Sequence, residues 1–167
     1  MRIAIYPGTF DPVTKGHLDV LHRACRIFDK VIMAVAPSST KGPLFTVPER
    51  VELIRANIEP GYNVEVSTFN GLLVDYARSV GACALCRGLR AVSDFEFEFQ
   101  MAQMNRELAD DVETIFFMPS QDYFYTSSNL VKQVACFAPE RVDKLVPVNV
   151  MQALKHKFPQ NHSNSIH

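Results

Sequence analysis

The sequence carries almost no net charge: 17 lysine and arginine residues stand against 18 aspartate and glutamate residues, which gives a formal net charge of −1. No broad basic surface is therefore expected to attract nucleic acid, and any anion site must be built from a few local cations. The sequence also lacks an apolar run long enough to span a membrane and an N-terminal pattern of charged and then apolar residues. We expect a soluble, cytoplasmic protein that binds neither nucleic acid nor a membrane.

Cysteine is scarce as well, with four residues, Cys25, Cys83, Cys86 and Cys136, at positions where we expect the core. A buried free thiol behaves as a small hydrophobic group, which suits a reducing compartment. Cys83 and Cys86 have the C-x-x-C spacing, but the chain lacks a second pair to complete a zinc site, and the pair lies in an apolar run rather than at the start of a helix. We therefore predict no redox role and no metal ligands among the side chains.

The remaining composition is that of an ordinary globular chain, with 47% hydrophobic and 21% charged residues over 167 residues. Short apolar runs alternate with segments of helical periodicity, which predicts a doubly wound, Rossmann-like α/β domain with a five-stranded parallel sheet and C-terminal helices. We expect this single domain to cover residues 1–158 and a polar, disordered tail to cover residues 159–167. The expected strands are residues 3–6, 31–36, 64–66, 82–86 and 113–118. The expected helices start near His17, Thr46, Leu72, Asp94, Ser127 and Val148.

Two of these helices have distinctive sequence patterns. Thr46 and Glu49 have the spacing of a capping box, and the apolar positions that follow predict a helix that continues to Pro60. Residues 94–99 alternate apolar and acidic side chains like a strand, yet no turn residue follows them before Met104. We interpret this segment as a helix whose phenylalanines lie in the core or at a subunit interface.

The stretch that organises the chain runs from Tyr6 to His17. An apolar strand leads into a turn that contains Gly8 and Gly16, and helical periodicity begins near His17. A turn of this kind combines free backbone N–H groups with the positive end of a helix dipole, which favours phosphate. At that end the His17 imidazole could donate a hydrogen bond where negative charge grows during phosphoryl or nucleotidyl transfer. The alternative is that His17 only packs against or caps the first helical turn.

Three other polar segments also follow expected strands. In a doubly wound sheet the carboxyl ends of the strands meet at one edge, so these segments converge with the first turn. The segments contain Lys41, the pair Arg87 and Arg90, and the pair Ser127 and Ser128. Each has a simpler interpretation: the lysine as an exposed loop residue, the arginines as surface groups or carboxylate partners, and the serines as a helix cap. Their convergence on one edge favours a site for phosphate groups.

These segments resemble the bacterial phosphopantetheine adenylyltransferases, a family of nucleotidyltransferases with an H-x-G-H signature. The resemblance runs over about residues 2–158, and Thr14 stands in the first position of that signature, as is typical for this branch. The last segment has Asn129 where the family usually has serine. The residues that carry the resemblance are Tyr6-Pro7-Gly8-Thr9-Phe10-Asp11-Pro12, Gly16-His17, Arg87-Gly88-Leu89-Arg90, Asp94-Phe95-Glu96 and Thr126-Ser127-Ser128-Asn129.

The resemblance implies that the chain transfers AMP from ATP to 4′-phosphopantetheine, which gives dephospho-coenzyme A and pyrophosphate by direct attack without a covalent enzyme intermediate. It also implies that His17 stabilises the transition state, that Mg²⁺ accompanies ATP, and that the protein forms a homohexamer with the phenylalanine-rich helix partly at its interfaces. By the same resemblance, the residues that bind 4′-phosphopantetheine would be Thr9, Lys41, Leu73 and Arg87. Those that bind ATP would be Thr9, Phe10, His17, Gly88, Leu89, Arg90, Glu98, Tyr123, Phe124, Tyr125, Thr126, Ser127, Ser128 and Asn129.

Two alternatives remain open from the sequence. The first is a related nucleotidyltransferase whose acceptor is nicotinate mononucleotide or glycerol 3-phosphate, although residues 87–90 favour phosphopantetheine. The second is a nucleotide-binding regulatory module that carries out no reaction. A group that stabilises the transition state affects turnover more than substrate affinity, so a substitution of His17 distinguishes an enzyme from such a module.

Overall fold

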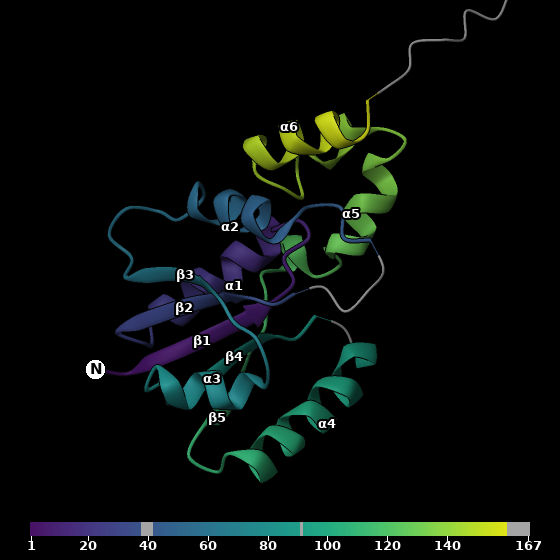
Figure 1. Cartoon of the computed structure of the whole chain (residues 1–167). Helices are drawn as coiled ribbons and strands as arrows, with labels where there is room; N and C mark the ends of the chain where they lie inside the picture. Colours follow the sequence, from purple (N-terminus) through teal and green to yellow (C-terminus); the bar gives the residue numbers. More distant parts are fainter. Residues whose placement is uncertain (38–41, 91, 160–167) are drawn as a thin grey trace, which may run out of the picture.

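The computed structural model describes residues 1–37, 42–90 and 92–159 and shows a parallel sheet with helices on both faces (Figure 1). The strand order is β3-β2-β1-β4-β5, and every neighbouring pair is parallel. This order confirms the doubly wound α/β architecture that the alternation of strands and helices predicts. The strands of the described residues are β1 (Ile3–Gly8), β2 (Lys30–Val35), β3 (Val64–Thr68), β4 (Ala84–Gly88) and β5 (Glu113–Phe117).

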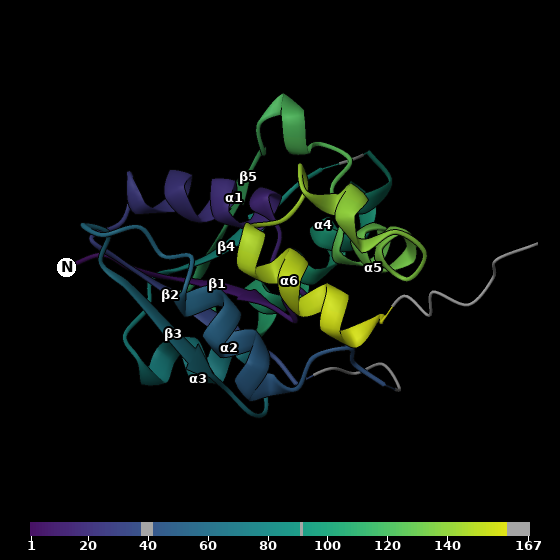
Figure 2. The same cartoon turned by 90° about the horizontal axis from the view of Figure 1, so that it is seen from above.

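The helices form two layers around the sheet. Helices α1 and α2 cover one face, while α3 and α4 cover the other (Figure 1). Seen from above, the C-terminal helix α6 lies over α2 (Figure 2). The α-helices of the described residues are α1 (Lys15–Cys25), α2 (Val47–Arg55), α3 (Leu73–Ser79), α4 (Val92–Leu108), α5 (Ser128–Ala135) and α6 (Val148–Lys157). Short 3-10 helices, η1 (Gln121–Tyr123) and η2 (Pro139–Val142), precede α5 and α6.

Strand β1 is buried on both faces. Ala4 and Tyr6 belong to the core cluster beneath α1 and α2, whereas Ile5 belongs to the cluster beneath α3. Successive side chains of a strand point to opposite faces, so a strand covered on both sides needs apolar residues at every position. This is why the sequence of β1 is a continuous apolar run rather than an alternating one.

Helix α2 begins where the sequence predicts and ends earlier. The Thr46 hydroxyl accepts the Glu49 N–H at 3.4 Å, and the Glu49 carboxylate accepts the Thr46 N–H at 2.7 Å, so the capping box is present. The helix ends at Arg55, and the expectation that it continues to Pro60 was wrong. The Asn57 side chain donates a 2.7 Å hydrogen bond to the Leu53 carbonyl, and this side-chain bond satisfies a C-terminal carbonyl without a further helical turn.

Two further expectations need correction. Arg87 and Gly88 are the last residues of β4 rather than part of the loop after it, because they continue the pairing with β5. Cys83 and Cys136 are exposed, so the expectation of core positions was wrong for these two cysteines. The reason is that one precedes the first residue of β4 and the other follows the last residue of α5, where the chain emerges from the core.

Helix α4 is a helix, as interpreted, but its phenylalanines are not in the core of this chain. Phe95, Phe97 and Phe99 are 48%, 62% and 48% exposed. Met101, Met104 and Leu108 are exposed as well. The helix contacts the edge strand β5, so only one side of it meets the rest of the chain (Figure 1).

Lys41 and the tail from residue 160 onward lie outside the described residues. Within the described ranges, the helices are too short or too polar to cross a membrane.

Candidate active site

A pocket of about 270 Å³ opens at the carboxyl ends of β1 and β4. These strands are neighbours in the sheet, with β2 and β3 on one side of them and β5 on the other. The order of the strands switches at this point, which is where doubly wound sheets bind their ligands. Of the site residues that the sequence predicts, the pocket is lined by Thr9, Phe10, His17, Arg87, Gly88, Arg90, Glu98, Tyr123, Thr126, Ser127, Ser128 and Asn129.

His17 lies in the first turn of α1, where a capping box with Thr14 fixes its ring. The Thr14 N–H donates to Nδ1 of His17 at 3.0 Å, and the His17 N–H donates to Oγ1 of Thr14 at 3.3 Å. An imidazole nitrogen that accepts a backbone N–H cannot itself carry a proton. The neutral ring therefore has its proton on Nε2, which makes Nε2–H the hydrogen-bond donor of His17.

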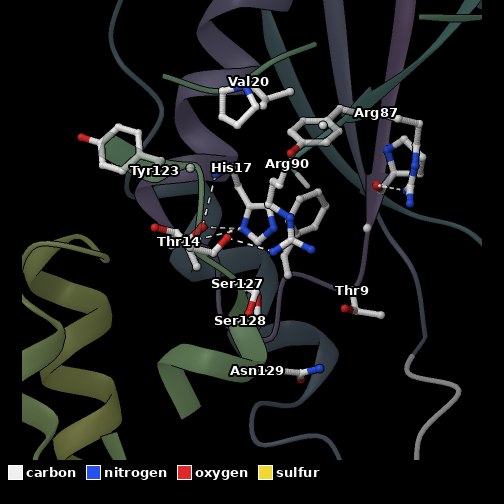
Figure 3. Close-up of a pocket in the computed structure, with 18 of the residues that line it drawn as sticks. Thr9, Thr14, His17, Val20, Arg87, Arg90, Tyr123, Ser127, Ser128 and Asn129 are labelled. Carbon is white, nitrogen blue, oxygen red and sulfur yellow. Dashed lines mark hydrogen bonds between the residues drawn. The ribbon is translucent and has the colours of Figure 1, made fainter. Parts of the chain in front are cut away.

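The surroundings of His17 keep this ring neutral. Burial lowers the pKa of His17 to about 3, and the positive charges of Arg90 and Arg87 act in the same direction. The ring of Phe10 packs edge-on against it, with ring centroids 5.1 Å apart. At neutral pH the His17 imidazole is therefore uncharged, and its Nε2–H is a hydrogen-bond donor in the pocket (Figure 3). The ring has almost no capacity as a general acid.

The turn between β1 and α1 has an unusual backbone at Phe10. This residue has a φ of 49°, in the left-handed region that a large side chain rarely adopts. Its ring is 2% exposed and fills the space below Gly8, where an added Cβ would lie 2.9 Å from the ring. A side chain at position 8 would therefore clash with the Phe10 ring. The same packing places that ring beside His17.

Arg87 and Glu98 form a charged pair in the pocket wall. The Arg87 Nε donates to Glu98 Oε2 at 2.9 Å, and Nη1 donates to the Pro7 carbonyl at 3.1 Å. Burial of Arg87 opposes its charge, but the hydrogen bonds and charge of Glu98 outweigh burial and raise the pKa of Arg87 above its usual value. The sequence predicts both residues as ligand-binding groups, and the structure adds that they bind each other.

Arg90 and the start of α5 form the opposite wall. Arg90 Nη1 donates to the Thr126 carbonyl at 2.9 Å, and its side chain lies beside His17 (Figure 3). Ser127 caps α5 by accepting the Leu130 N–H at 3.1 Å, so the helix-cap interpretation is correct for this serine. The positive end of the α5 dipole also faces the pocket, so the cap and the anion-binding role are compatible.

Four predicted residues fall outside this pocket lining. Leu73 packs against the core cluster on the α3 face, Tyr125 is 81% exposed, and Leu89 and Phe124 are not among the lining residues within the described chain. Their roles stay predictions, as does that of Lys41.

The sequence reasoning missed the function of Thr14. It noted Thr14 only as a position in the family signature, whereas the structure makes it the residue that fixes the His17 tautomer. The available signal was the spacing of three between Thr14 and His17, which is the spacing of a capping box with histidine in place of the usual glutamate.

The chain has clear relatives among known proteins. The family model for cytidylyltransferase-like proteins matches residues 5–134. A solved structure from Vibrio parahaemolyticus, provisionally assigned as a nicotinate-nucleotide adenylyltransferase, is similar with a TM-score of 0.65 at 20% sequence identity, over 93% of each chain. At this identity the similarity shows the fold alone. The family match and the fold together define a cytidylyltransferase-like protein.

Two relatives are much more similar. The phosphopantetheine adenylyltransferase of Alkaliphilus metalliredigens is 52% identical over 157 residues, which cover 94% of this chain and 99% of the relative. The phosphopantetheine adenylyltransferase of Geobacter sulfurreducens is 54% identical over 157 residues, which cover 94% of this chain and 95% of the relative. The chain belongs to the phosphopantetheine adenylyltransferase family, as the resemblance of its motifs indicated.

Proposed function

We propose that the pocket transfers the adenylyl group of ATP to 4′-phosphopantetheine and releases dephospho-coenzyme A and pyrophosphate. The observation that carries this proposal is the Nε2–H of a neutral His17 at the start of α1, with Arg90 beside it and the start of α5 opposite. This arrangement offers hydrogen-bond donors and positive charge at one point. Such a site stabilises negative charge that grows on a phosphate.

The reaction needs no base from the protein. A phosphate monoester is largely a dianion at neutral pH, so an oxygen of the 4′-phosphopantetheine phosphate can attack the α-phosphorus of ATP directly. A new P–O bond forms there, and the bond to the oxygen that bridges to the β-phosphate breaks, which releases pyrophosphate. His17 Nε2–H donates to an α-phosphate oxygen as its charge increases, and catalysis depends on position and electrostatics.

The two substrates occupy different ends of the pocket in this proposal. ATP binds along residues 88–90 and the segment from Tyr123 to Asn129, where Arg90 and the α5 dipole balance its phosphates. The phosphate of 4′-phosphopantetheine binds near Thr9 and Arg87, at the end of β1. Lys41 and Leu73 complete the acceptor site according to the family pattern.

Mg²⁺ enters with ATP as part of the substrate. Within the described residues there is no group of three or more histidine, cysteine or acidic side chains that could hold a metal ion, and the pocket carboxylate of Glu98 is bound to Arg87. The triphosphate brings most of the oxygen ligands that Mg²⁺ prefers. We therefore expect chelation of Mg²⁺ to stop turnover and added Mg²⁺ to restore it.

We also propose that the protein is a cytoplasmic homohexamer. Exposed apolar side chains occur along α4 from Phe95 to Leu108, and apolar and aromatic side chains of this kind are common in protein interfaces. In the hexamer these side chains would be covered by neighbouring subunits.

The first experiment is incubation of the protein with ATP, Mg²⁺ and 4′-phosphopantetheine. We expect dephospho-coenzyme A and pyrophosphate in equal amounts. Nicotinate mononucleotide and glycerol 3-phosphate serve as alternative acceptors, and we expect neither to release pyrophosphate at a comparable rate. Folded protein that yields no dephospho-coenzyme A would contradict the proposal.

The second experiment tests the role of His17. His17→Ala should lower kcat by about 10²- to 10³-fold while the affinity for ATP changes by less than about threefold, because the lost bond acts mainly in the transition state. His22→Ala is the matched control, since His22 lies on the same helix and stacks against Tyr62. A proportional loss of ATP binding and turnover in His17→Ala would favour a nucleotide-binding module instead.

A further inference from the structure

A cluster of charged side chains holds the turn between β1 and α1 without belonging to the pocket lining. Asp11 and Arg50 are 4% and 1% exposed, and Lys132 reaches Asp11 from α5. Within the described chain, none of the three is among the residues that line the pocket. Burial of charged groups is costly unless they are well paired, so their contacts indicate what they do.

Arg50 binds three separate segments of backbone. From α2, its Nη1 donates to the carbonyls of Thr9 at 2.6 Å and Ala36 at 2.9 Å, and its Nε donates to the Phe45 carbonyl at 3.1 Å. The planar guanidinium presents several donors in fixed directions, which a lysine ammonium cannot reproduce. Arg50 therefore joins the end of β2 and the start of α2 to the turn that carries Thr9.

Asp11 belongs to the same turn and binds the segment that precedes α2. Its Oδ1 accepts the Phe45 N–H at 2.8 Å, and its Oδ2 accepts the Leu44 N–H at 3.0 Å. Lys132 donates to Oδ2 at 3.1 Å. Arg50 thus holds the residue before Phe10, and Asp11 is the residue after it.

The residue between these two anchors is the one with the disfavoured backbone. Phe10 has a φ of 49°, and such a conformation persists only where the surrounding structure holds it on both sides. In that conformation the Phe10 ring packs edge-on against His17, and the preceding residue, Thr9, lines the pocket. The backbone of one residue therefore sets the position of two groups in the site.

We propose that Arg50 and Asp11 are positioning residues for adenylyl transfer, which act by holding Phe10 in its left-handed conformation. This inference rests on the proposed function. Neither residue is among the described residues that line the pocket. Their effect on the reaction passes through Phe10 to His17.

The contact between Asp11 and Lys132 of α5 also stabilises the part of the pocket where we propose that ATP binds. Lys132 lies on α5, whose first residues line the pocket, and the Ser128 hydroxyl donates to the Pro12 carbonyl at 2.8 Å. The turn after β1 and helix α5 are therefore held together at two points. Small displacements of groups that contact a reacting phosphate reduce the rate strongly, so rigid support here affects turnover.

The test compares Arg50→Lys with Arg55→Lys. Both residues lie on α2 and donate to backbone carbonyls, but Arg55 contacts Val66 at 3.3 Å, away from the pocket. We expect Arg50→Lys to lower kcat by about 10- to 100-fold, with the dissociation constant of ATP changed by less than about threefold. We expect Arg55→Lys to resemble the wild type in both quantities.

A second measurement is independent of turnover. The ring proton signals of His17 in NMR spectra report its contact with the Phe10 ring, and His17→Ala identifies them by their loss. We expect Arg50→Lys to shift these signals and Arg55→Lys to leave them in place. A purely structural role predicts a lower melting temperature with unshifted His17 signals and a normal kcat for the folded protein.

The outcomes separate the two proposals. If Arg50→Lys retains kcat within about twofold of Arg55→Lys, or if kcat falls while the His17 signals stay in place, the positioning role is wrong. If Arg50→Lys does not fold, Asp11→Asn decides by the same two measurements, because the amide keeps only one of the two oxygens that accept the Phe45 and Leu44 N–H groups. If the wild type forms no dephospho-coenzyme A, the proposed function fails, and the His17 signals of the variants still test the positioning role.

Discussion

At the scale of single residues, His17 shows how local contacts select one chemical form of a side chain. The Thr14 N–H occupies Nδ1, and burial with the nearby charges of Arg90 and Arg87 keeps the ring unprotonated. A histidine in this form can donate a hydrogen bond from Nε2 over a wide range of pH, but it cannot deliver a second proton. The residue therefore suits a reaction that needs charge stabilisation and no proton transfer.

The pH dependence of His17 follows from this argument. Its pKa is lowered from 6.5 to about 3, so we expect its ring signals in NMR spectra to stay unchanged from about pH 8 to about pH 5. In the unfolded chain the same ring takes up a proton below its usual pKa, while the folded chain does not until about pH 3. The ionisation of His17 therefore destabilises the folded state as the pH falls from 6.5 to about 3.

Two measurements check this expectation. A His17 titration near its usual pKa would contradict the lowered value. Urea unfolding at neutral and acidic pH should show that His17→Ala loses less stability on acidification than the wild type, since the variant lacks this ionisation.

At the scale of elements, α4 shows that an amphipathic pattern defines an apolar face without defining what covers it. Phe97, Met101, Met104 and Leu108 follow helical spacing, which predicts the helix correctly. In this chain their side chains are 62%, 43%, 55% and 44% exposed. Contact with β5 covers only one side of the helix, so the remaining apolar side chains are available to another subunit.

We expect a charge on this face to disrupt assembly. Phe97→Glu would place a carboxylate in a desolvated apolar interface, and the cost of burying it should shift the protein to smaller oligomers. Light scattering after size-exclusion chromatography measures the change. Gln152→Glu is the control, because it adds the same charge to an exposed position on α6, on the opposite side of the molecule from α4 (Figure 1). An unchanged oligomer in Phe97→Glu, or a monomeric wild type, would contradict the proposed interface.

At the scale of the whole molecule, the strand order decides where the polar segments meet. The order β3-β2-β1-β4-β5 puts the ends of β1 and β4 side by side, and the chain from β5 to α5 closes the pocket beside them. The ligand site is therefore built from segments that are more than a hundred residues apart in the chain. Ligand binding should stabilise the whole fold, because only the folded chain brings these segments together.

We therefore expect ATP to raise the melting temperature of the protein. ATP with Mg²⁺ at about 100 times its dissociation constant should add about 2.7 kcal/mol to the free energy of unfolding. For a protein of this size the melting temperature should rise by about 5–10 °C. Arg90→Ala should reduce this rise at the same ATP concentration, while the exposed control Arg78→Ala, whose side chain pairs with Asp111, should retain it. A melting temperature that ATP does not change would contradict ATP binding at this site.

Local patterns determined the order of strands and helices. The Thr46 and Glu49 capping box and the apolar run of β1 depend on residues close in sequence, so their structure could be predicted directly. The position of His17 at a helix start could be predicted for the same reason. Family resemblance added the two substrates and the roles of distant residues, which the patterns alone leave open.

Tertiary structure decided the properties that depend on partners far away in the chain. The pairing of Arg87 with Glu98, the exposure of α4 and the anchoring of Phe10 by Arg50 and Asp11 have no signature in local spacing. Burial and hydrogen-bond partners depend on how the segments come together around the sheet, whereas helix and strand periodicity depends on neighbouring residues. The sequence by itself therefore determined the strands, the helices and the polar segments between them, and the folded chain determined which of the described segments meet and the chemical state and orientation of their groups.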